Sequence, residues 1–193
     1  MQPALPESDH DLLTRSAAGD AAAFEVFVER HRAAVFRYAR ELCGHDADAE
    51  DVLQQTFVQV WRSGGVAVER VRPWLYAIAR HALQRLRRRP SAAPEEPASL
   101  DELGAAAGFA SEAATPERLA AAIEERAVLL ATLDALPVQD REVLVLRELE
   151  ELSGEETAAV LGLSLDAMKS RLHRARLHFV AEVRRRLPEG ATS

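Results

Sequence analysis

The sequence predicts an all-α protein, in which two small helical domains are joined by a flexible acidic linker. Apolar residues recur every three or four positions through most of the chain, which is the period of an amphipathic helix. The 193 residues include only 9 glycines and 9 prolines, and Ala, Leu, Arg and Glu dominate. No alternating run of apolar and polar residues is long enough to predict a strand. With 48% hydrophobic residues the chain can form real cores.

Composition and charge suggest how the chain is divided. We expect a first domain at 1–89, a linker at 90–115, a second domain at 116–187 and a tail at 188–193. The linker is rich in Pro, Ser, Ala and Glu and has no sustained period, which is typical of flexible segments. The formal net charge of −7 argues against a nucleic-acid partner, but the negative excess lies largely in the middle. Cations cluster at 80–89 and 169–186, and local fields steer partners more than net charge does.

The sequence does not indicate an enzyme, a metal site or a cofactor. Cys43 is the single cysteine, so we expect a small buried hydrophobe and no disulfide framework. His173 and His178 fall on different helix faces, and Gly64 and Gly65 are not followed by the lysine of a phosphate loop. No nucleophile, base and orienting group stand together. The N-terminal residues have no apolar leader and no run is long enough to span a membrane, which predicts a cytoplasmic location and no membrane partner.

The first two helices have clear boundaries. Residues 9–18 form a short helix that ends at Gly19, and Asp20 caps the next helix. That helix has an apolar side, formed by Phe24, Phe27, Val28, His31, Val35, Tyr38 and Leu42. His31 on this side is expected to be a packed, hydrogen-bonded imidazole.

A third helix begins at Asp46, where several carboxylates suit the positive end of the helix dipole. It places an uncharged polar strip beside an apolar and aromatic one. The polar strip is Gln54, Gln55, Thr56 and Gln59, and the other is Val52, Leu53, Phe57, Val60 and Trp61. The residues alone leave two interpretations open, an ordinary surface helix and a protein docking face.

After a loop from Ser63 to Arg72, Pro73 fits the first position of a fourth helix. Its expected core residues are Leu75, Ile78, Ala79, Ala82, Leu83 and Leu86, and the residues left outside are Trp74, Tyr76, Arg80, His81, Arg85 and Arg87 to Arg89. Aromatic rings interleaved with arginines suit unpaired nucleic acid, because rings stack on bases and guanidinium groups hold phosphates. The alternative is a basic helix end whose arginines extend to solvent over half-buried aromatics.

The second domain begins at Thr115 and Pro116, is interrupted at Pro137 and continues as a helix to Leu149. A tight helical hairpin follows. Ser153 and Glu156 have the spacing of a capping box, Gly162 fits the end of the helix, and Ser164 caps the next helix with Asp166 in its first turn.

The last helix has one packing face and one cationic face. Its apolar stripe is Leu165, Met168, Leu172, Ala175, Phe179 and Val183, and outside it stand Lys169, Ser170, Arg171, His173 and Arg174. This division predicts a helix that lies in a DNA major groove. The alternative is a plain amphipathic hairpin whose arginines are solvated.

Two blocks of the chain resemble the sigma factors of bacterial RNA polymerase, specifically the extracytoplasmic-function (ECF) group. DAEDVLQQTFVQVWRS, followed by PWLYAIARHALQRLRRR, resembles the second sigma domain. LPVQDREVLVLRELEELSGEETAAVLGLSLDAMKSRLHRAR resembles the fourth. The resemblance implies core RNA polymerase, promoter DNA and an anti-sigma factor as partners, no cofactor, and a linker that threads the RNA exit region of polymerase.

The resemblance also implies a role for three sets of residues. Polymerase docking falls to Asp51, Gln54, Gln55, Phe57 and Trp61. Opening and reading of the minus-ten element fall to Trp74, Tyr76, Arg80, His81 and Arg85. Reading of the minus-thirty-five element falls to Ser164, Asp166, Lys169, Ser170, Arg171 and Arg174.

Three departures from the family pattern have expected consequences. Gln55 stands where Glu is usual, which removes one charged contact with polymerase. His81 stands where Asn is common, which bears on the minus-ten base that is recognised. The loop at 63–72 is shorter than expected for the segment that helps to capture a flipped base.

Two other functions fit parts of the sequence. A sigma mimic would bind an anti-sigma factor without productive DNA contact, but the cationic helix from Lys169 and the lack of a fused receiver domain argue against it. An ordinary helix-turn-helix regulator would bind a palindrome as a dimer without polymerase. Co-purification with core polymerase separates this last function from that of a sigma factor.

Overall fold

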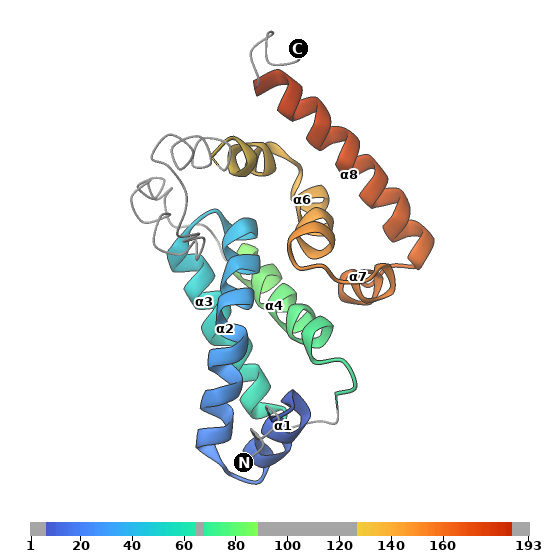
Figure 1. The fold of residues 1–193 in the computed structure, drawn as a ribbon. Helices are drawn as coiled ribbons and strands as arrows, with labels where there is room; N and C mark the ends of the chain where they lie inside the picture. Colours follow the sequence, from blue (N-terminus) through green and yellow to red (C-terminus); the bar gives the residue numbers. More distant parts are fainter. Residues whose placement is uncertain (1–6, 65–67, 89–126, 187–193) are drawn as a thin grey trace, which may run out of the picture.

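The computed structural model describes residues 7–64, 68–88 and 127–186, all of them in helices or the turns that join helices (Figure 1). The helices are α1 (Asp9–Ala17), α2 (Ala21–Cys43), α3 (Asp46–Arg62), α4 (Val71–Arg87), residues 127–135, α6 (Val138–Leu144), a π-helical segment (Val145–Leu149), α7 (Gly154–Leu161) and α8 (Leu165–Arg186). The all-α prediction is confirmed. The linker and tail expected at 90–115 and 188–193 lie outside the described residues.

Helices α1 to α4 form a first bundle around aromatic side chains. Asp20 caps α2, since its carboxylate accepts a hydrogen bond of 3.1 Å from the amide of Ala23. Phe27 is fully buried, and its ring centroid lies 4.7 Å from that of His31. The Nε2 atom of His31 lies 2.8 Å from the Asp9 carboxylate, and burial lowers the pKa of the imidazole. The packed, hydrogen-bonded His31 is therefore confirmed.

Cys43 is partly buried, and burial raises the pKa of its thiol to about 12.

The second bundle, residues 127–186, contains the expected helical hairpin. Ser153 and Glu156 form the capping box. The backbone N–H of Ser153 donates a hydrogen bond of 2.8 Å to the Glu156 carboxylate, and the backbone N–H of Glu156 donates one of 3.2 Å to the Ser153 hydroxyl. Gly162 ends α7 at φ 66°, a left-handed conformation that glycine adopts without strain. Ser164 then accepts a hydrogen bond of 3.2 Å from the amide of Ala167 at the start of α8.

Removal of the capping box is expected to lower the stability of the second bundle measurably. Ser153→Ala is expected to lower the free energy of unfolding of the second bundle by about 1 kcal/mol, because an orphan amide at the start of α7 loses its acceptor. Urea denaturation followed by circular dichroism measures this change. Ser170→Ala, an exposed serine on α8, is the matched control, and an equal loss in both variants would contradict the assignment.

Two local predictions were wrong. Helix α4 begins at Val71 rather than at Pro73, so the proline stands third in the helix, where its missing N–H still costs no intrahelical bond. The regular helix expected up to Leu149 instead becomes π-helical after Leu144. The amide of Glu150 donates to the carbonyl of Val145 at 2.9 Å, an i→i+5 bond that widens the last turn.

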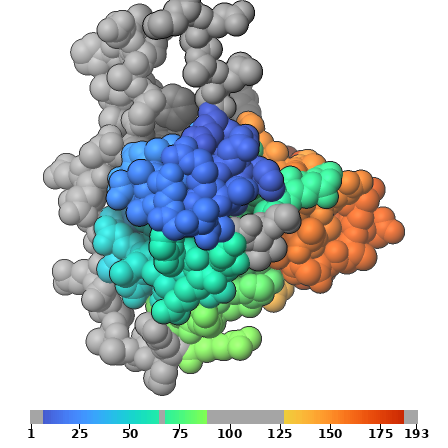
Figure 2. Space-filling view, turned by 90° about the horizontal axis from the view of Figure 1, so that it is seen from below, coloured from blue at the N-terminus to red at the C-terminus, as the bar shows by residue number. Residues whose placement is uncertain are grey.

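The two bundles pack against each other. Helix α4 contacts α7, and α2 contacts α6 and the π-helical segment; in Figure 1 the green α4 lies beside the orange α6 and α7. Arg70, just before α4, pairs with Glu156 of α7 at 3.6 Å, and on the face drawn in Figure 2 the green and orange surfaces meet. None of the helices in the described ranges is long and apolar enough to cross a membrane.

Candidate functional site

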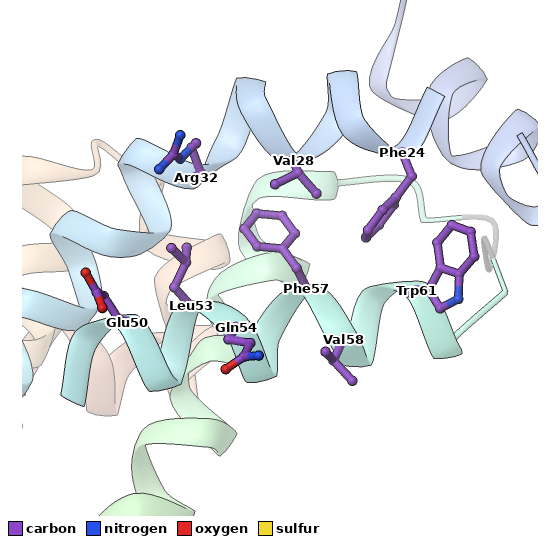
Figure 3. Close-up of a pocket in the computed structure, with 9 residues that line it drawn as sticks. All are labelled: Phe24, Val28, Arg32, Glu50, Leu53, Gln54, Phe57, Val58 and Trp61. Atoms are coloured by element: carbon purple, nitrogen blue, oxygen red, sulfur yellow. The ribbon is translucent and has the colours of Figure 1, made fainter. Parts of the chain in front are cut away.

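An apolar groove of about 500 Å3 lies between α2 and α3. It is lined by Phe24, Val28, Arg32, Glu50, Leu53, Gln54, Phe57, Val58 and Trp61 (Figure 3). The rings of Phe24 and Trp61 meet edge to face at one end, with centroids 4.9 Å apart, and the charged Arg32 and Glu50 stand at the other end. Trp61 is 47% exposed and Val58 41%, which is unusual for large apolar side chains that sit together.

The groove includes three of the five side chains expected on the docking helix. Gln54, Phe57 and Trp61 line it, although Phe57 is only 7% exposed and forms its floor. Asp51 is exposed and Gln55 is partly exposed, both outside the groove. The contribution of α2 was missed, because Phe24 and Val28 were assigned to the core on the evidence of their apolar stripe alone.

The first half of α8 presents the expected cationic face. Ser164, Asp166, Lys169, Ser170 and Arg174 are exposed and Arg171 is partly exposed. Met168, Leu172 and Ala175 of the predicted stripe are buried.

The cations of α8 differ along its length. Within the described residues no ion pair is recorded for Lys169, Arg171 or Arg174. By contrast, Arg176 pairs with Glu148 at 2.6 Å, and further along the helix Arg186 pairs with Glu182 at 2.9 Å. Within the described part of the chain, three cations without an ion pair therefore lie in the first three turns of α8.

The five side chains expected at the minus-ten element are not all accessible. His81 and Arg85 are exposed and, with Gln59, Ile78, Gln84 and Arg88, line a hollow of about 510 Å3 between α3 and α4. Trp74 is half-buried and packs against the core. Arg80 pairs with Glu142 at 3.1 Å. The expectation that Tyr76 stands outside the core was wrong, because only 2% of it is exposed.

Tyr76 and Tyr38 are buried beside carboxylates of the second bundle. The hydroxyl of Tyr76 donates to Glu150, and that of Tyr38 donates to Glu142 at 3.1 Å. Burial, together with the adjacent carboxylate, raises the pKa of both phenols well above the ordinary value. Both hydroxyls act as donors to these carboxylates.

Comparison with known proteins places both bundles in one family. Residues 27–92 match the family model for Sigma-70 region 2, and residues 126–179 match that for Sigma-70, region 4. The ECF RNA polymerase sigma factor SigL of Mycobacterium tuberculosis is 31% identical over 163 residues, which cover 83% of this chain and 88% of SigL. The chain belongs to the ECF sigma factors.

Other comparisons extend this assignment to the three-dimensional fold. RNA polymerase sigma factor CnrH of Cupriavidus metallidurans is 35% identical to this sigma factor over 174 residues, which cover 88% of this chain and 91% of CnrH. The solved structure of CnrH in complex with the cytosolic domain of CnrY superposes with a TM-score of 0.68 and 29% identity, covering 94% of this chain and 100% of that chain. As an ECF sigma factor, the protein is a transcription initiation factor and not an enzyme.

Proposed function

We propose that this sigma factor binds core RNA polymerase through the α2/α3 groove and directs it to promoters by two DNA contacts. The first half of α8 reads the minus-thirty-five element as duplex, and the end of α4 holds one strand of the minus-ten element. The proposal rests on one observation above all: Lys169 and Arg174 are exposed and Arg171 is partly exposed, none of the three has an ion pair within the described part of the chain, and a buried apolar stripe lies beside them. A helix of this kind can enter a major groove without breaking any internal ion pair.

Chemical complementarity supports polymerase docking in the groove. Trp61 and Val58 leave apolar area exposed next to the polar Gln54, and a partner helix with an apolar face would bury that area. Gln55 of α3 brings no charge, so we expect docking to depend on apolar burial more than on ion pairs.

The minus-ten contact is proposed for the hollow around His81 and Arg85. The amide groups of Gln59 and Gln84 can hydrogen-bond to the edge of an unpaired base, and Arg85 and Arg88 can hold phosphates. His81, which stands where Asn is common in the family, changes the donor and acceptor pattern offered to that base. Residues 65–67 of the short loop expected at 63–72 lie outside the described residues.

We also propose two functional units, of which the first ends near residue 89 and the second begins near residue 116. We further propose an anti-sigma factor as a protein partner. The solved complex of CnrH with the cytosolic domain of CnrY supports a direct protein partner of the sigma factor. Dividing promoter recognition between two modest contacts lets each be weak while the assembly is specific.

Transcription in vitro tests the function as a whole. Purified chain and core RNA polymerase are incubated with a library of promoter fragments, and the transcripts are sequenced. We expect initiation from a small set of fragments that share two elements. Failure to stimulate initiation from any fragment would refute the proposed function.

Substitutions on α8 test the duplex contact. Arg171→Ala or Arg174→Ala is expected to weaken binding to the selected minus-thirty-five duplex by about 1 to 3 kcal/mol if the guanidinium meets a base edge. Fluorescence anisotropy at several salt concentrations measures the loss. Arg184→Ala, which removes an exposed charge further along the same helix, is the control. Equal weakening on all duplexes with a shallower salt dependence would instead assign the residue to phosphate contact.

A further inference from the structure

Lys169 is the only lysine in the sequence. The chain holds 24 lysine and arginine side chains, and the other 23 are arginines. The two cations differ in chemistry, because a guanidinium group does not give up its proton in proteins, whereas the amine of lysine can lose one and become a nucleophile. Lysine is accordingly the basic side chain to which acetyl and other acyl groups are attached. An acyl group that is attached to a basic side chain of this protein is therefore attached at position 169.

Lys169 is accessible on a well-fixed part of the helix. It is exposed in the second turn of α8 and has no ion pair within the described part of the chain. The preceding residue, Met168, is only 1% exposed, and its amide donates to the carbonyl of Ser164 at 2.9 Å. The core thus holds the backbone at this point while the lysine side chain stands in solvent. A small dissolved acyl donor can reach the amine without any movement of the fold.

The charges around Lys169 favour an acyl donor that carries a phosphate. Arg174 is exposed and Arg171 partly exposed on the same part of α8, and neither has a recorded ion pair in the described ranges. His173 follows Lys169 by four residues, which makes the two side chains neighbours on the helix surface. Asp166, three residues before Lys169, brings one negative charge against these cations. The local charge remains positive, and such a surface raises the concentration of anionic molecules beside it.

We infer that Lys169 is a site of acylation by an acyl phosphate, and that the modified chain binds the minus-thirty-five duplex more weakly. This inference rests on the proposed role of α8 in reading that duplex. The ammonium group first gives a proton to solvent, and the nitrogen then attacks the carbonyl carbon of the donor. A C–N bond forms and the C–O bond to phosphate breaks. Inorganic phosphate leaves with the electron pair and takes up the second proton from the nitrogen, so the product is a neutral amide.

Acylation of Lys169 changes the DNA contact and little else. It removes one positive charge from the face of α8 that is proposed to enter the major groove, and with it one contact to a phosphate or a base edge. The 23 arginines keep their charges, since an acyl phosphate does not modify them under these conditions. None of the residues that line the α2/α3 groove is a lysine. A single acyl group therefore weakens promoter binding and leaves the proposed polymerase contact unchanged.

The test uses the full chain, acetyl phosphate as the acyl donor and the selected minus-thirty-five duplex. Mass spectrometry locates the acetyl group, and fluorescence anisotropy measures the affinity for the duplex before and after the reaction, which is also run with the duplex already bound. Lys169→Arg keeps the charge without an amine, and Lys169→Gln imitates the neutral acetylated side chain. The matched control adds Arg184→Lys to Lys169→Arg, which moves the only lysine to an exposed position further along α8. The α-amine is common to all variants, so its reaction cancels in the comparison.

We expect acetylation at Lys169, protection of this residue by bound duplex, and a loss of duplex affinity of about fivefold or more. Lys169→Gln should show the same loss without the reagent, and Lys169→Arg should bind normally and stay insensitive to it. The relocated lysine should be acetylated with no effect on affinity.

Three results would overturn the inference. They are the absence of acetylation at Lys169, acetylation that leaves the affinity unchanged, and an equal loss of affinity in treated Lys169→Arg. Failure of the proposed function is detected separately, because bound duplex would then give Lys169 no protection and Arg171→Ala would leave duplex binding unchanged.

Discussion

Trp61→Ala is expected to weaken binding of the sigma factor to core RNA polymerase by about 2 to 4 kcal/mol, the range of a central aromatic side chain at an interface. Trp61 is 47% exposed and closes one end of the groove against Phe24. Its truncation removes a large apolar surface that a docked helix would bury, and it leaves the core below largely intact. Competition with a labelled sigma factor for purified core polymerase measures the affinity.

A second groove variant separates docking from folding. Val58→Glu places a carboxylate on the exposed rim of the groove, where Val58 is 41% exposed, and is expected to weaken docking by a similar amount without removing a core contact. Val26→Glu is the matched control, because Val26 is 51% exposed on α2 but does not line the groove. If all three variants bind core polymerase equally well, the polymerase contact lies elsewhere.

Local signals predicted most of the secondary structure. The capping box at Ser153, the left-handed Gly162 and the buried stripe of α8 depend on residues only a few positions apart, and such patterns can be read from one sequence. His31 was also placed correctly, since its helical period put it among apolar neighbours. These features were sufficient to predict the cationic face of α8 without any knowledge of the rest of the fold.

The contacts between the bundles could not be predicted from such local sequence patterns. Glu150 is 113 residues from Arg37 and 74 from Tyr76, and no short-range period encodes a pairing at that distance. Tyr76 was assigned outside the core because it lies off the main stripe of α4, yet a second helix face is buried when the other bundle packs there. The π-helical turn at Val145–Leu149 has no recognisable signal in the sequence, where the segment has the ordinary pattern of an α-helix.

Arg37→Ala is expected to weaken the contact between the two bundles, because Arg37 of α2 donates to both carboxylate oxygens of Glu150, at 2.8 and 2.9 Å. The substitution leaves the fully buried Glu150 carboxylate with the Tyr76 hydroxyl as its remaining side-chain donor. Keeping an inadequately paired charge buried costs about 3 to 5 kcal/mol. Separation of the bundles returns Glu150 to water and avoids that cost. We therefore expect separation with little loss of stability in either bundle.

Hydrogen exchange distinguishes opening from unfolding. In Arg37→Ala, amides next to Tyr76 and Glu150 are expected to lose protection while the buried core around Phe27 keeps it. Arg37→Lys should give a smaller effect, since lysine keeps the charge but cannot form the bidentate pair. Arg32 pairs with Glu29 of the same helix at 3.4 Å, so Arg32→Ala should leave exchange around Glu150 unchanged. Loss of protection throughout the first bundle would mean that Arg37 supports the fold itself, whereas loss confined to amides near Glu150 would locate its role in the contact between the bundles.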